Sequence, residues 1–116
     1  MGNRFEISML LDIYSELLTG TQRDIMNLYY NEDYSLAEIS EINNTSRQAI
    51  HDNIKRCNKL LNTYEEKLNL LKLQEDMKKK DKVLLKKLGE IKEISDNIDV
   101  NKKINDLMKI IVDHGV

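Results

Sequence analysis

The fold of this chain is decided by residues 35–61, which read SLAEISEINNTSRQAIHDNIKRCNKLL. Ser35 is followed three residues later by Glu38, and this spacing is the capping box that starts a helix. Asn43 and Asn44 then favour a tight turn, because asparagine tolerates the left-handed backbone conformation. The first half of the stretch therefore predicts a short helix that ends in a turn.

The second half of the stretch predicts another helix. Thr45 and Gln48 repeat the capping-box spacing directly after the turn. In the first helix, apolar residues at helical spacing are expected to face inward; they are Leu36, Ile39 and Ile42. A short helix, a tight turn and a longer helix form the helix-turn-helix arrangement, in which the second helix is the recognition helix.

The recognition helix is expected to be long, because its apolar residues step by four and three well past the stretch. They are Ile50, Ile54, Cys57, Leu61, Tyr64, Leu68 and Leu71. Such a seam is typical of helices that pack along their length. The part up to about Cys57 closes the helix-turn-helix core, and the part beyond needs another cover. The first helix or a second subunit would provide it, and we expect a homodimer.

Two further helices precede the stretch. Apolar spacing predicts a first helix over about Phe5–Leu18, and Thr19 with Gln22 forms a capping box that starts the second. The inner residues expected of the second helix are Ile25, Leu28 and Tyr29. Adjacent helical residues diverge by about 100°. We therefore place Tyr29 in the core and Tyr30 partly at the surface, which favours packing over a platform for stacking RNA bases.

The chain is thus predicted to be all-α, with a helix-turn-helix domain over residues 1–73 and a helical extension over residues 74–116. The run Met77–Lys82 is a solvated hinge or helix face. Two helices are expected after this run, and a turn at Ser95–Asp99 separates them. Their apolar residues are Val83, Leu84, Leu88, Ile91, Ile94, Ile104, Leu107, Met108 and Ile111, with the last helix ending near Asp113. We expect the extension to serve dimerisation or packing.

Composition excludes several classes of protein. No apolar run approaches the ~20 residues that span a bilayer, and no signal peptide opens the chain. The single Cys57 excludes an internal disulfide framework and fits the cytoplasm. No glycine-rich phosphate loop, metal-spaced Cys/His cluster or nucleophile with a base is visible. We therefore expect no enzyme activity, cofactor, metal or small-molecule substrate, and no membrane association.

Charge is unevenly distributed along a chain whose net charge is −2. Residues 1–45 carry two basic and eight acidic side chains, whereas residues 46–59 carry four basic side chains and one acidic. The recognition helix is therefore the one clearly positive segment of an acidic protein.

The same residues carry a family resemblance. Residues 36–61 resemble the C-terminal promoter-reading domain of bacterial sigma factors. The chain is still more similar to the YlxM family of small bacterial helix-turn-helix proteins, through ISMLLDIY at 7–14, LTGTQRDIMNLYYNEDYSLAEIS at 18–40, SRQAIHDNIKR at 46–56 and YEEKL at 64–68. The resemblance implies a DNA-binding regulatory protein that acts in, or regulates, the signal recognition particle pathway of protein targeting.

A recognition helix inserts its first turns into the major groove. The DNA-binding candidates on this helix are Ser46, Arg47, Gln48, His51, Lys55, Arg56 and Lys59. Arg47 would pair with guanine or hold a phosphate, and Gln48 would read adenine unless it serves as the capping partner. Asp52 opposes phosphate binding and is expected to pair with Arg56 within the helix. The competing interpretation is an ordinary solvated helix face.

Two functions therefore stay open. In the first, the helix-turn-helix binds DNA and dimerisation sets two recognition helices side by side. In the second, the helix-turn-helix is the scaffold of an adaptor that binds the protein or RNA of the signal recognition particle, with the acidic N-terminal half facing a basic partner.

Overall fold

The computed structural model describes residues 3–114, which are all-α, as predicted, and contain no strand. The helices are α1 (Arg4–Tyr14), the 3-10 helix η1 (Ser15–Leu17), α2 (Gly20–Tyr30), α3 (Leu36–Ile42), α4 (Arg47–Leu68), α5 (Leu70–Ile94) and α6 (Ile98–His114). The chain divides into two compact units, one up to Leu71 and one from Lys72 onward. Each unit is described by itself.

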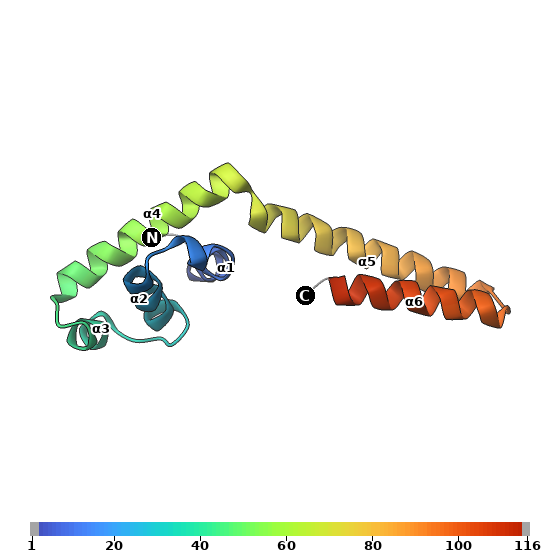
Figure 1. The fold of residues 1–116 in the computed structure, drawn as a ribbon, viewed down its shortest axis with the longest axis horizontal. Helices are drawn as coiled ribbons and strands as arrows, with labels where there is room; N and C mark the ends of the chain where they lie inside the picture. Colours follow the sequence, from blue (N-terminus) through green and yellow to red (C-terminus); the bar gives the residue numbers. More distant parts are fainter. Residues whose placement is uncertain (1–2, 115–116) are drawn as a thin grey trace. The chain divides into compact units, whose positions relative to one another are not determined.

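In the first unit, α4 packs against each of α1, α2 and α3 (Figure 1). The helices enclose one apolar core, whose buried side chains are Ile7, Leu10, Leu11, Tyr14, Leu18, Ile25, Met26, Tyr30, Ile39, Ile50, Ile54, Cys57 and Leu61. Cys57 lies in this core, as predicted, and burial raises the pKa of its thiol above the ordinary 9.0. The seam of α4 as far as Leu61 is thus covered by the helices of its own unit.

Helix starts follow the predicted capping boxes at two places. The Thr19 hydroxyl accepts from the backbone N–H of Gln22, while the Gln22 side chain accepts from the N–H of Thr19. Ser35 and Glu38 make the same reciprocal pair at the start of α3. Hydrogen bonds from Ser35 to the Glu38 carboxylate lower the pKa of that carboxyl below its ordinary 4.5. These boxes satisfy backbone N–H groups that a helix start leaves without partners.

The long seam predicted through Leu71 is interrupted. α4 ends at Leu68, and Asn69 adopts the left-handed conformation (φ 53°) before α5 begins. As a result Leu68 is 51% exposed instead of packed, although Leu71 still packs against the core. Asparagine tolerates this conformation, which is why the helix can end there.

The break is held by side chains of the first unit. The buried Tyr14 hydroxyl donates to Glu65 Oε1 at 2.6 Å and accepts from the backbone N–H of Leu70 at 3.1 Å. The same carboxylate oxygen accepts from the N–H of Leu71 at 3.0 Å. The first backbone N–H groups of α5 are thereby satisfied, which is what a helix start requires.

The prediction that Tyr30 lies partly at the surface is wrong, whereas Tyr29 packs against the core from a partly buried position. Tyr30 is buried, at 8% exposure, and Tyr29 is only partly buried. The Tyr30 hydroxyl makes a reciprocal hydrogen bond with the buried Asn58 amide, at 3.2 and 2.9 Å. The core accepts Tyr30 because Asn58 supplies a partner for its polar end.

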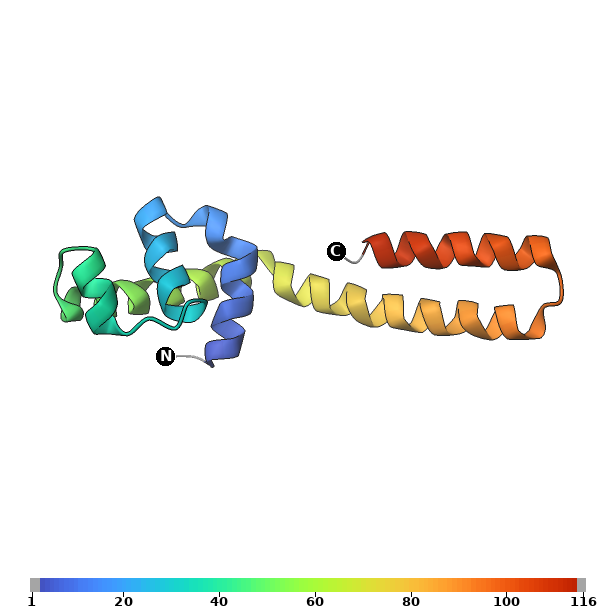
Figure 2. The same cartoon turned by 90° about the horizontal axis from the view of Figure 1, so that it is seen from below.

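The second unit is a hairpin of α5 and α6, which run antiparallel and side by side (Figure 2). The lysine-rich run at 77–82 is a continuous part of α5, so it forms a helix face and not a hinge. The predicted turn narrows to the residues between Ile94 and Ile98. None of the helices in the described part of the chain is long and apolar enough to cross a membrane.

Candidate nucleic-acid interface

The turn between α3 and α4 has the geometry of a helix-turn-helix. Asn43 closes α3, and Asn44 takes the left-handed conformation (φ 51°) that the sequence predicted for this turn. The backbone N–H of Thr45 donates to the carbonyl of Ser40 at 3.0 Å. This bond ties the chain back to α3, and it leaves the next residue to begin α4.

The capping box predicted at Thr45 is therefore wrong. Ser46, in extended conformation, is the N-cap of α4, and its hydroxyl accepts from the backbone N–H of Ala49 at 3.0 Å. Thr45 belongs to the turn, so the cap lies one residue later than the spacing with Gln48 indicated. Ser46, a candidate for DNA contact, thus has its hydroxyl engaged in starting the helix.

Because Ser46 caps α4, the Gln48 side chain is not used in a capping box and contacts Asp52 one turn later. Its side-chain amide donates to the Asp52 carboxylate at 2.9 Å. His51, expected at the surface, is half-buried, and its Nδ1 lies 3.6 Å from the same carboxylate without a hydrogen bond. Asp52 is thus oriented by its neighbours, and the predicted ion pair with Arg56 is absent among the described residues.

The basic candidates on α4 are exposed and carry no ion pair in the described part of the chain. They are Arg47, Lys55, Arg56 and Lys59. At about 100° per residue, Gln48, Asp52, Lys55 and Lys59 fall within one narrow sector of the helix surface. That sector lies opposite the buried face, so these side chains can reach a ligand together. Within this sector the two positive charges of Lys55 and Lys59 stand against the one negative charge of Asp52, while Arg56 lies beside the sector and Arg47 lies on another side of the first turn of α4.

The buried face of α4 sets how this surface is presented. Ile50 and Ile54 are 1% and 0% exposed, so the helix cannot rotate without opening the core. Asn58, which follows Ile54 by one helical turn, continues this face through its bond with Tyr30. Sequence reasoning did not assign Asn58 to the core, although its four-residue spacing from Ile54 was an available signal.

Helix α3 presents a mixed surface beside the interface. Ile39 is buried, as predicted, but Ile42 is 56% exposed, so its predicted inward position is wrong. Ser40 is buried in its place and donates to the carbonyl of Ala37 at 2.7 Å. Because α3 is only two turns long, its last residue passes the edge of the core.

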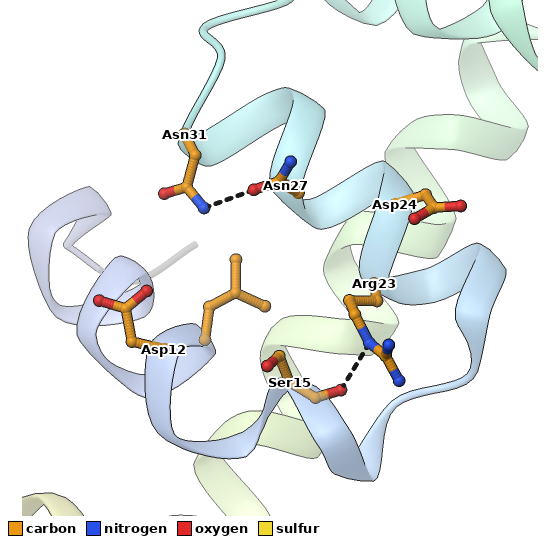
Figure 3. Close-up of a pocket in the computed structure, with 7 residues that line it drawn as sticks. Asp12, Ser15, Arg23, Asp24, Asn27 and Asn31 are labelled. Carbon is orange, nitrogen blue, oxygen red and sulfur yellow. Dashed lines mark hydrogen bonds between the residues drawn. The ribbon is translucent and has the colours of Figure 1, made fainter.

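The remaining surface of the first unit is acidic. Its two basic residues before α3 are already engaged: Arg4 pairs with Asp33 at 2.6 Å, and Arg23 lies 3.9 Å from Glu16. A pocket of about 260 Å³ lies between α1 and α2 (Figure 3). It is lined by Leu11, Asp12, Ser15, Arg23, Asp24, Asn27 and Asn31. In it, Arg23 Nε donates to the Ser15 carbonyl at 3.2 Å, while Asp12 and Asp24 stay exposed.

In the described part of the chain, no group of three or more His, Cys, Asp or Glu side chains is placed to hold a metal ion. The first unit thus offers a partner two surfaces of different charge. One is the basic surface of α4, and the other is the acidic surface of α1 and α2.

Comparison with known proteins identifies the family. The profile described as "Putative helix-turn-helix protein, YlxM / p13 like" (UPF0122) matches residues 1–111. A UPF0122 protein of Clostridium novyi is 46% identical, over 98% of this chain and 99% of its own length. UPF0122 proteins of Clostridium botulinum and Clostridium perfringens are 60% and 49% identical, over 80% and 93% of this chain and 83% and 98% of their own lengths. With its helix-turn-helix geometry and this match, the chain belongs to the UPF0122 family of YlxM / p13-like helix-turn-helix proteins.

Proposed function

We propose that this protein is a cytoplasmic, non-enzymatic regulator that binds DNA through α4. The observation that carries the proposal is the set of exposed basic side chains on the helix that follows the turn, which make no ion pair with any residue between 3 and 114. A recognition helix presents such side chains to the major groove while its buried face holds it against the domain. We further propose that it acts as a homodimer, so that two such helices contact two half-sites.

The residues divide by the kind of contact they suit. Lys55, Arg56 and Lys59 suit phosphates, which give affinity without sequence choice. Arg47, exposed at the first turn of α4, suits the paired acceptors of guanine. Gln48 is no longer needed as a cap, but its amide is held by Asp52, so reading adenine requires that bond to open. Sequence choice therefore rests chiefly on Arg47.

A mobility-shift experiment tests this function. DNA is first selected from a random-sequence pool with the wild-type protein, and the selected DNA is then bound by the double variant Arg47→Ala, Lys55→Ala. We expect affinity to fall on the order of tenfold or more, and the salt dependence to lose roughly one phosphate contact, that of Lys55.

The matched control is the double variant Lys102→Ala, Lys109→Ala, which removes the same charge from exposed positions on α6. It should bind the selected DNA like the wild type if the two lysines lie outside the interface. Equal binding by wild type and the α4 double variant contradicts the proposed recognition helix.

A second candidate function is favoured by the acidic surface. Because Arg4 and Arg23 are engaged by carboxylates, the side of α1 and α2 offers Asp12 and Asp24 to a basic partner. Such a partner would be the protein component of the signal recognition particle, or a complex of that protein with its RNA. In this function α4 is a scaffold or a second contact, and the protein is an adaptor.

Retention of the particle's purified protein and RNA on the immobilised chain tests the adaptor. We expect retention that weakens with salt and with the double variant Asp12→Asn, Asp24→Asn. The control is Asp76→Asn with Asp96→Asn, which makes the same charge change in the second unit. Failure of the wild type to retain either component rules the adaptor out.

A further inference from the structure

The second unit leaves most of its apolar side chains exposed. Among its described residues, Ile104 is the one buried apolar side chain, at 5% exposure. By contrast Leu84, Ile91 and Leu107 are 49%, 45% and 50% exposed. A unit of this size rarely holds a stable fold without additional burial. The hairpin of α5 and α6 is therefore one layer of a larger assembly.

The side chains that lie between α5 and α6 define the inward side of each helix. Half-buried apolar side chains mark the inward side of each helix around Ile104; they are Leu85 and Leu88 on α5, with Met108 and Ile111 on α6. The two helices run antiparallel (Figure 2), and the lower exposure of these residues places them on the sides of α5 and α6 that face each other. All other positions can be placed by their angle from this inward side, at about 100° per residue.

Each helix carries a second apolar stripe beside its inward side. On α5 it consists of Leu73, Met77, Leu84 and Ile91, and on α6 of Val100, Leu107 and Ile110. On each helix the stripe lies roughly a quarter turn from the inward side, and the rotation from inward side to stripe has the same sense in both helices. Because both helices are right-handed and run in opposite directions, the same sense of displacement brings both stripes to one face of the hairpin. This face is called the apolar face below.

The outer borders of the apolar face carry opposite charges. Beyond the stripe of α5 lie Lys80 and Lys87, seven residues apart, and beyond the stripe of α6 lie Asp106 and Asp113, also seven apart. All four side chains are exposed. Residues seven apart recur on nearly the same side of a helix, so each pair forms a row of one sign along its border.

We propose that the apolar face binds the same face of a second copy of this chain, forming a four-helix bundle with its two-fold axis parallel to the helices. In this arrangement α5 packs against α6 of the other copy. The proposal specifies the interface of the homodimer proposed above, and it rests on that dimer. An isologous contact of this kind uses one self-complementary surface, as closed dimers do.

The charged borders select this axis. With the axis parallel to the helices, the lysine border of α5 meets the aspartate border of the partner's α6. With the axis across the helices, α5 would meet α5, and lysine would face lysine while aspartate faced aspartate. Like charges placed opposite each other disfavour that second arrangement.

The register also fits. Lys87 lies seven residues before the end of α5 at Ile94, and Asp106 lies eight residues after the start of α6 at Ile98. Both are thus at similar heights above the turn, and a two-fold axis parallel to the helices preserves height. Lys87 therefore faces the partner's Asp106, and by the same spacing Lys80 faces the partner's Asp113.

One residue interrupts the apolar face. Lys103 lies within the stripe of α6, but its aliphatic stem can cover apolar surface while its ammonium reaches the border.

The two-fold axis parallel to the helices bears on DNA binding, because it places the α5 start of both copies at the same end of the bundle. The two helix-turn-helix units are then joined to the dimer from one end.

Charge exchange tests this interface in the full chain by sedimentation equilibrium. One variant carries Lys80→Glu and Lys87→Glu, and the other carries Asp106→Lys and Asp113→Lys. Each should dimerise on the order of tenfold more weakly than the wild type, because like charges then meet at the borders. An equimolar mixture should restore dimers, since each border again meets its opposite.

A second pair of variants tests the apolar face itself. Leu84→Glu places a charge on this face, whereas Val83→Glu places it on another side of α5, where Val83 is 57% exposed. We expect dimer loss for Leu84→Glu alone, with helix content by circular dichroism unchanged in both. Equal dimerisation of the two variants, or a mixture of charge variants that stays monomeric, overturns the interface.

The outcomes separate this interface from the proposed function. A wild-type chain that is monomeric at micromolar concentration overturns both the interface and the homodimer. A wild-type dimer that is insensitive to the charge exchange overturns the interface alone. DNA binding by α4 is measured in the mobility-shift experiment and stands or falls independently.

Discussion

Removing the hydroxyl of Tyr14 tests whether its hydrogen bonds stabilise the break between the end of α4 and the start of α5. This hydroxyl donates to Glu65 Oε1 at 2.6 Å and accepts from the N–H of Leu70 at 3.1 Å. Burial of the ring, followed by the bond to Glu65, raises the pKa of Tyr14 above its ordinary 10.0, so it is protonated and a donor at neutral pH. Tyr14→Phe keeps the ring, which is 1% exposed, and deletes only the polar atom.

The expected cost follows from the bonds lost. A hydrogen bond to a charged group contributes about 1.5–3 kcal/mol. The Leu70 N–H adds little, because Leu70 is 39% exposed and water can replace the lost acceptor. We therefore expect the free energy of unfolding to fall by about 2 kcal/mol, which lowers the melting temperature of a domain of this size by roughly 8–16 °C.

Thermal and urea unfolding followed by circular dichroism measure this loss, and amide hydrogen exchange locates it. The exchange of the Leu70 and Leu71 amides should accelerate more than that of the α4 core. Tyr34→Phe is the matched control, because the partly buried Tyr34 makes no hydroxyl hydrogen bond in the described part of the chain. A Tyr14→Phe variant no less stable than the Tyr34→Phe variant refutes the role assigned to this hydroxyl.

Three further predictions follow from the caps and the core. Ser46→Ala should lower the free energy of unfolding by about 1 kcal/mol, whereas Thr45→Ala should change it little; the opposite ranking in urea unfolding would restore the cap to Thr45. Cys57 should react with a thiol reagent only after unfolding, because it is buried and its thiol pKa is raised; labelling of the native protein at the rate of the unfolded chain would contradict its placement. Since the folded-state pKa of Glu38 is lowered, its contribution to stability should be complete above pH 4.5 and be lost as pH falls through the lowered pKa; Glu38→Gln should flatten this part of the acid unfolding profile.

Local patterns in the sequence predicted the elements of the fold well. The boxes at Thr19 and Ser35 and the left-handed Asn44 depend on residues within one helical turn, so spacing alone identifies them. The same holds for Ile50 and Cys57, because residues that recur at helical spacing must share a face. The positive segment of the candidate interface is likewise visible from the order of its charged residues.

Other features depend on partners far away in the chain. Tyr30 is buried because Asn58 on another helix satisfies its hydroxyl, and no local pattern reveals that bond. The cap of α4 moved to Ser46 because a backbone bond to Ser40 keeps the preceding residue in the turn. Once the cap moved, Gln48 was free to bond Asp52, which changed the chemistry of the candidate interface.

Local residue order thus specifies the helices, most of their starts and the apolar face of α4, because these follow from propensity and spacing over a few residues. Tertiary structure decided where the long seam ends. Spacing would continue it through Leu68, but Asn69 turns left-handed while Tyr14 and Glu65 hold the first N–H groups of α5. A helix ends where its unpaired backbone groups find other partners, and those partners come from the packing of distant segments.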